Sequence, residues 1–172
     1  MTFNINNSAD LKLIAATLHD ARFTADAINY DKAARILTLK CWVREPKQKR
    51  FNGSVMAQLA QDKIDSAGKT QRLSGFKAFF SFCARAFQAL WRPGVTNDPR
   101  PWKACQLSFA NVVDCKVNAK EKVRRYELAT IRFSERDHKL DLVTHCAIEI
   151  NLAVGQLDGA LTETSETRDK WD

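Results

Sequence analysis

The chain has 172 residues, of which 45% are hydrophobic and 27% are charged. This balance is typical of a globular domain with a real core, and it excludes disordered and collagen-like chains. The net charge is +7. No run of about 18 uncharged apolar residues exists, so we expect no integral membrane segment. The first residues also lack the features of a secretory leader.

The first predicted elements are a short helix and a β-hairpin. Ser8 is the expected helix N-cap, because its side chain can accept a hydrogen bond from the first turn. The apolar face of this helix consists of Leu11, Ile14 and Leu18. Alternating residues over Arg22–Val43 then predict two antiparallel strands joined by a turn at Asp31–Ala34.

Residues 44–103 form a basic segment that interrupts this alternation. They hold 12 lysines and arginines against four acidic residues, a charge of +8, whereas the rest of the chain carries −1. Helical spacing is clear over Ser74–Arg92 and less regular over Phe51–Ala67, which predicts a helical insertion. The Ser74–Arg92 helix has an aromatic face and ends at Pro93-Gly94, and we expect this face to cover the sheet.

The last third of the chain predicts a β-meander. Its strands are Leu107–Val117, Tyr126–Phe133 and Leu140–Val154. The apolar positions of the second strand change parity, which indicates a β-bulge near Ala129. The third run is long for one strand, so we expect it to bend. Residues 161–172 are polar and predict a flexible tail.

The predicted architecture is a single α+β domain over residues 1–160. Its antiparallel sheet has five or more strands, ends in the β-meander and is covered on one face by the amphipathic helix. The basic helical insertion, residues 44–103, lies between the second and third strands of this sheet.

The cysteines indicate a reducing compartment. Their number is odd and no CxxC spacing occurs, so a disulfide or zinc framework is not predicted. Most of them lie in apolar runs, where a free cysteine behaves as a small hydrophobic residue. We therefore expect reduced core thiols in a cytoplasmic protein. The five residues are Cys41, Cys83, Cys105, Cys115 and Cys146.

A candidate polar site consists of His19, Asp20 and His145. A histidine and an aspartate at a helix-to-strand junction can serve as metal ligands or as an acid–base pair. The alternative is structural, with a histidine at a helix C-terminus and an aspartate in the following turn. His145 is predicted on a polar strand face about 13 Å from Asp141 and Glu149, too far to share an ion. Without HxH or HExxH spacing we predict no metal and no cofactor.

A candidate binding surface is basic. It can meet an acidic protein partner or the phosphates of a nucleic acid, with Phe51 and Trp102 stacking on bases. The alternative is a solvated charged face without a partner. For the aromatic helix, docking on a partner, dimerisation included, and lying on an anionic membrane surface also stay open. The residues assigned to the basic surface are Arg44, Lys47, Lys49, Arg50, Arg85 and Arg92.

Three stretches near the N-terminus carry a family resemblance. Leu18–Phe23 (LHDARF), Ile28–Asp31 (INYD) and Ile36–Leu39 (ILTL) together resemble the opening "HDA" hairpin of small bacterial β-domain proteins. Some of those proteins are uncharacterised and some are proposed immunity proteins of toxin systems. The resemblance covers about 30 to 40 residues. It implies a non-catalytic binding protein of the bacterial cytoplasm, and it carries over no functional residue.

The sequence favours a binding protein over an enzyme. It contains no GxSxG, GxxxxGK[ST] or GxGxxG motif. The predicted function is therefore a non-catalytic interaction domain that uses its basic segment to meet an acidic partner. Two alternatives are a nucleic-acid-associated protein and a metal-dependent or histidine-based hydrolase built on His19, Asp20 and a distant histidine.

Overall fold

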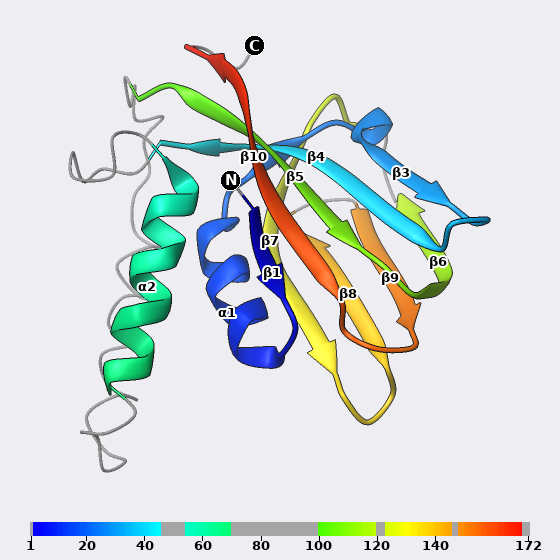
Figure 1. The fold of residues 1–172 in the computed structure, drawn as a ribbon. Coiled ribbons are helices and arrows are strands. Elements are labelled where there is room, and N and C mark those ends of the chain that lie inside the picture. The colour runs from blue at the N-terminus through cyan, green and yellow to red at the C-terminus, as the bar shows by residue number, and fades with distance from the viewer. Residues whose placement is uncertain (1, 46–53, 70–99, 120–122, 146–147, 170–172) are drawn as a thin grey trace.

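The structure is a computed structural model that describes residues 2–45, 54–69, 100–119, 123–145 and 148–169 (Figure 1). Its helices are α1 (Ser8–Thr17), α2 (Val55–Lys69) and the short 3₁₀ turn η1 (Ala25–Ala27). Its strands are β1 (Thr2–Ile5), β2 (Arg22–Phe23), β3 (Ile28–Asp31), β4 (Ile36–Arg44), β5 (Trp102–Phe109), β6 (Val112–Ala119), β7 (Tyr126–Ser134), β8 (Lys139–Thr144), β9 (Ile148–Val154) and β10 (Gly159–Arg168). Neither helix of this part of the chain has the length and apolarity needed to cross a membrane.

The strands form one antiparallel sheet in the order β1-β10-β5-β4-β2-β7-β8-β9-β6, with β3 added beside β4. The short strand β2 joins the two halves, because Arg22 pairs with Trp42 of β4 on one side and with Glu127 of β7 on the other. In Figure 1 the half that contains β4, β5 and β10 lies in front of the half that contains β7, β8 and β9. The predicted α+β class with an antiparallel sheet is confirmed.

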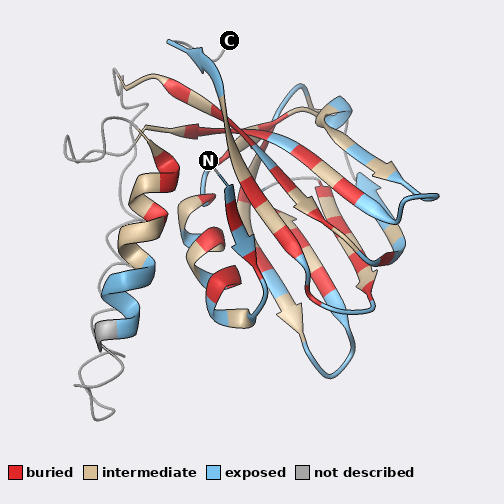
Figure 2. Cartoon of the chain, in the orientation of Figure 1, coloured by how far each residue is buried: buried red, intermediate tan, exposed pale blue. Residues whose placement is uncertain are grey.

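The core lies between these two halves and under α1. Alternate residues of each strand point into it, such as Leu37 and Leu39 of β4 and Ile150 and Leu152 of β9, all at most 1% exposed. Figure 2 shows this alternation as red bands that recur along the strands. Burial of apolar area on this scale is the main force that holds the sheet in its curved form.

Helix α1 lies against β7 and β1, and its predicted apolar face is confirmed. Leu11, Ile14 and Leu18 are all buried. The predicted N-cap is wrong by one residue. Asn7 has the extended backbone of a cap, and its Oδ1 accepts hydrogen bonds from the N–H groups of Ala9 and Asp10, at 2.9 Å each.

Helix α2 lies beside α1 and near β1 and β10. Its first turns bury Val55, Met56 and Leu59, whereas Ile64 is 64% exposed. A salt bridge of 2.7 Å from Lys63 to the buried carboxylate of Asp10 ties α2 to α1. The predicted covering helix over Ser74–Arg92 lies outside the described residues, as does most of the basic segment, so both stay predictions. The predicted place of this segment between the second and third strands is wrong, because it connects the fourth strand, β4, to the fifth, β5.

Two predicted strands of the β-meander are wrong because each is two strands. Leu107–Val117 breaks at Asn111, whose left-handed φ of 58° ends β5 and sends β6 to the other half of the sheet. Leu140–Val154 is divided into β8 and β9, which pair with each other. The predicted bulge is confirmed, because the register between β7 and β8 shifts between Leu128 and Thr130.

The predicted flexible tail is wrong for residues 161–168. These residues form most of β10, which pairs with β1 on one side and β5 on the other. Leu161 of this strand is fully buried. Gly159 begins the strand at a close approach, since a Cβ there would lie 2.8 Å from the carbonyl oxygen of Ser108.

Candidate functional site

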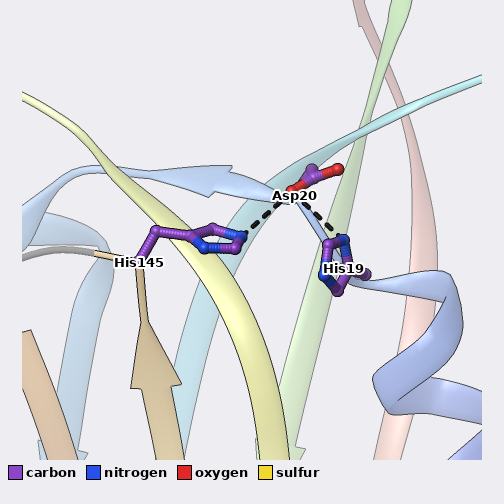
Figure 3. A group of neighbouring side chains, drawn as sticks. All are labelled: His19, Asp20 and His145. Atoms are coloured by element: carbon purple, nitrogen blue, oxygen red, sulfur yellow. Dashed lines mark hydrogen bonds and ion pairs between the residues drawn. The ribbon is translucent and has the colours of Figure 1, made fainter. Parts of the chain in front are cut away.

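The three residues of the predicted polar site lie together on the surface (Figure 3). Asp20 Oδ1 is 3.1 Å from His19 Nδ1 and 3.1 Å from His145 Nε2. The two imidazole rings meet edge to face, with centroids 5.4 Å apart and an interplanar angle of 77°. One carboxylate oxygen therefore stands between two imidazole nitrogens from distant parts of the chain.

Backbone hydrogen bonds to β7 hold this His–Asp cluster in place. The N–H of Asp20 donates to the carbonyl of Leu128 at 2.8 Å, and the N–H of Leu128 donates to the carbonyl of Ala21 at 2.8 Å. On the other side of β7, the N–H of His145 donates to the carbonyl of Glu127 at 3.0 Å. Figure 3 shows β7 running between the two histidines, whose side chains reach toward Asp20 from either side.

Turn geometry explains how His19, Asp20 and His145 come together although Asp141 does not join them. Asp20 is in a turn after α1 with a left-handed φ of 66°, so its side chain does not point away from that of His19 as strand neighbours would. His145 follows the last residue of β8 instead of lying within a strand. Asp141, on β8, accepts a hydrogen bond from the side chain of Asn151 and is no part of the cluster.

The His–Asp cluster offers two nitrogen donors and one oxygen donor to solvent. The side chains of His19, Asp20 and His145 are 49%, 67% and 45% exposed. One possible ligand atom from each lies within 4.8 Å of the other two. Imidazole and carboxylate together form a donor set that transition-metal ions accept.

A second polar feature is a cavity of about 570 Å³ on the outer face of β4, which we call the basic pocket. Its lining includes the cations Lys40, Arg124, Arg125 and Arg168. Among the lining residues that the structure describes, Asp26 alone is acidic. The excess of positive charge around a concave surface favours an anionic ligand.

Two tryptophans are buried beneath cations, and one of them, Trp42, lines the basic pocket. Trp42 and Trp102 are 5% and 3% exposed and pack with Ala104 in a small cluster separate from the main core. The guanidinium carbon of Arg168 lies 4.2 Å from the ring centroid of Trp42, and Arg44 lies at the same distance from Trp102. The predicted stacking of Trp102 on nucleic-acid bases is therefore wrong, because its ring is already covered.

Further contacts fix these cations. The guanidinium carbon of Arg22 lies 4.7 Å from the centroid of the Trp102 ring. The same arginine forms a 2.8 Å salt bridge with Glu127. Arg44 donates from Nη1 to the carbonyl of Arg100 at 2.8 Å. Lys40 forms a salt bridge of 2.8 Å with Glu166. We call this arrangement the arginine–tryptophan layer, made of Trp42, Trp102, Arg22, Arg44 and Arg168.

The predicted basic surface coincides with the arginine–tryptophan layer at one residue, Arg44. Its other residues, Lys47, Lys49, Arg50, Arg85 and Arg92, lie outside the described part of the chain. The sequence reasoning did not assign the cations of the basic pocket. Arg124 and Arg125 lie between the predicted strands Leu107–Val117 and Tyr126–Phe133, and Arg168 belongs to the predicted tail, so no single motif linked them.

The described cysteines are core residues rather than nucleophiles. Burial raises the pKa of Cys41 well above its usual value and raises that of Cys105 to about 12, with the carboxylate of Glu163 adding to the shift at Cys105. The pKa of the half-buried Cys115 is also raised, first by burial and then by Asp114. These thiols are free and protonated at neutral pH, so they are poor nucleophiles.

Comparison with known proteins assigns the chain to no family. No protein-family model, curated protein or solved structure matches it significantly. The resemblance to "HDA"-hairpin proteins therefore stays a prediction.

Proposed function

We propose that this chain is a non-catalytic binding protein that takes an acidic segment of a partner protein into the basic pocket. The observation that carries the proposal is the charge of the pocket lining, in which three arginines, Arg124, Arg125 and Arg168, outnumber the one described lining carboxylate, Asp26. The fourth lining cation, Lys40, is paired with Glu166. A cavity of about 570 Å³ can admit a few side chains of a peptide.

Stacking prepares one pocket cation for this task. The Trp42 ring holds the guanidinium of Arg168 at 4.2 Å. A side chain that is already ordered loses less conformational entropy when a ligand binds. The planar fork of an arginine also matches a carboxylate in a bidentate arrangement.

An acidic protein segment fits this site better than a nucleic acid does. Proteins that bind single strands combine a basic groove with exposed aromatic rings on which bases stack. Here Trp42 and Trp102 are at most 5% exposed and are covered by cations. The basic pocket therefore provides charge without an aromatic platform.

Fluorescence anisotropy with a labelled, aspartate- and glutamate-rich peptide tests the proposal. Variants Arg168→Met and Arg124→Met keep the aliphatic stem and remove one pocket charge each. We expect each to weaken binding by about tenfold at low salt, since charged interface contacts are worth about 1.4 kcal/mol or more. The matched control is Arg136→Met, which removes the same charge from the exposed turn between β7 and β8.

Two outcomes oppose the proposal. Equal weakening in Arg136→Met and in the pocket variants would show that the peptide senses net charge and no particular site. A labelled single-stranded oligonucleotide that binds tightly, with a steep dependence on salt, while the peptide does not bind would favour the nucleic-acid alternative.

A further inference from the structure

We propose that His19, Asp20 and His145 form a surface site for one divalent transition-metal ion of the zinc type. The ion would join the turn after α1 to the turn after β8, two segments about 125 residues apart in the chain. This inference is independent of the basic pocket and of the proposed peptide binding.

The spacing of the donor atoms suits such an ion. With metal–ligand bonds of about 2.0–2.1 Å, the donor atoms of a tetrahedral zinc site lie about 3.3 Å apart. Asp20 Oδ1 is 3.1 Å from His19 Nδ1 and 3.1 Å from His145 Nε2, and a donor from each residue lies within 4.8 Å of the others. A small closure of the two rings would therefore complete one face of the tetrahedron.

The donor types select the metal. Two imidazoles and one carboxylate suit Zn²⁺, Co²⁺, Ni²⁺ or Cu²⁺, whereas Mg²⁺ and Ca²⁺ prefer oxygen ligands alone. Three protein ligands leave a fourth position for water, and the exposure of all three side chains leaves the site accessible from solvent.

The scaffold around the cluster is already ordered. Asp20 and His145 are each held by a backbone hydrogen bond to β7, at 2.8 and 3.0 Å. The bulge between Leu128 and Thr130 lies next to these bonds, and bulges commonly re-aim side chains at functional sites. The carboxylate of nearby Glu127 is engaged by Arg22 at 2.8 Å, which leaves Asp20 as the acidic ligand.

Isothermal titration of the full chain with Zn²⁺ tests the site. We expect one ion per chain, and we expect His145→Ala and Asp20→Asn each to weaken binding at least about tenfold. Asparagine tolerates the left-handed backbone of residue 20, and His145 is exposed, so both variants should fold. The matched control is His138→Asn, the third histidine, whose loss should leave zinc affinity unchanged.

Cobalt provides the readout that separates this site from cysteine ligation. The absorption of the Co²⁺-loaded chain should show d–d bands without a thiolate charge-transfer band, and His145→Ala should lose the d–d bands. Wild-type affinity retained in His145→Ala, or a thiolate band in the wild type, would overturn the proposal. Added Zn²⁺ should raise the midpoint temperature of thermal unfolding of the wild type and of His138→Asn but not that of His145→Ala.

Discussion

The two faces of β4, β5 and β10 are built from alternate residues of the same strands, yet they are covered in different ways. On the inner face, Cys41, Cys105 and Leu161 pack among other apolar side chains of the core. On the outer face, Trp42 and Trp102 are buried to a similar extent, but beneath arginines. Burial alone therefore does not distinguish a face sealed by apolar side chains from one covered by cations.

The difference lies in what does the covering. A guanidinium stacked on an indole ring removes apolar area from water while its N–H edges can still donate hydrogen bonds. An apolar side chain on the inner face has no such group to offer. Variants of the inner face should therefore change stability, and variants of the outer face should change binding with little effect on stability.

The largest effect is expected from Leu161→Ala on the inner face. Leu161 is fully buried between β1 and β5, so its truncation removes apolar contacts and leaves a cavity. We expect the free energy of unfolding in urea to fall by about 2–5 kcal/mol. Val113→Ala on β6, where the side chain is 60% exposed, is the control and should change it by less than about 0.5 kcal/mol. A small effect of Leu161→Ala would mean that the inner face is loosely packed.

An intermediate effect concerns pH and the thiol of Cys105. Burial raises its folded-state pKa to about 12, whereas a cysteine in the unfolded chain titrates near 8.5. The stabilisation is present below about pH 8.5 and is lost as the pH rises toward 12, because the unfolded chain releases a proton that the folded chain retains. One thiol lowers the free energy of unfolding by at most about 1.4 kcal/mol per pH unit.

Urea unfolding of the wild type and Cys105→Ala at several pH values measures this contribution. The variant should lose less stability between about pH 9 and 11 than the wild type does. Cys115→Ala changes a half-buried thiol, so it should alter the slope of the free energy of unfolding against pH less. Identical slopes for the wild type and Cys105→Ala would show that the inner face admits water near β5.

Much of the sheet could be predicted from alternation, and its errors have two causes. The pairing of β3 with β4 within the predicted hairpin and the bulge at Ala129 follow from the parity of apolar residues. The first arm of that hairpin was predicted as one strand, but η1 divides it into β2 and β3. The alternation of apolar residues also continues through turns. The sequence therefore predicted β5 and β6 as one strand and β8 and β9 as another. In the first case the break depends on the left-handed backbone of Asn111, which an alternation of side chains does not reveal. The threonine-rich strand β10 was missed because its single deeply buried side chain, Leu161, makes no visible pattern.

The two candidate sites were predictable to different degrees. His19, Asp20 and His145 could be named because histidines are few, but their convergence depends on turns and on pairing across β7. The basic pocket draws its cations from β4, the segment before β7 and the end of β10. Only the order of strands in the sheet brings these segments together, and composition carries no information about that order.

The smallest effect on stability is expected from Arg44→Met in the arginine–tryptophan layer. Methionine keeps an apolar stem over Trp102 and loses the cation–π contact and the hydrogen bond to the Arg100 carbonyl. We expect a loss of about 1 kcal/mol in urea unfolding, because the lost contacts are partly exposed to water. Arg132→Met, at an exposed position on β7, is the control and should change stability by less than about 0.5 kcal/mol. If Arg44→Met lowered the free energy of unfolding as much as Leu161→Ala does, the outer layer would be a second core. The two faces would then differ in composition, but both would serve stability.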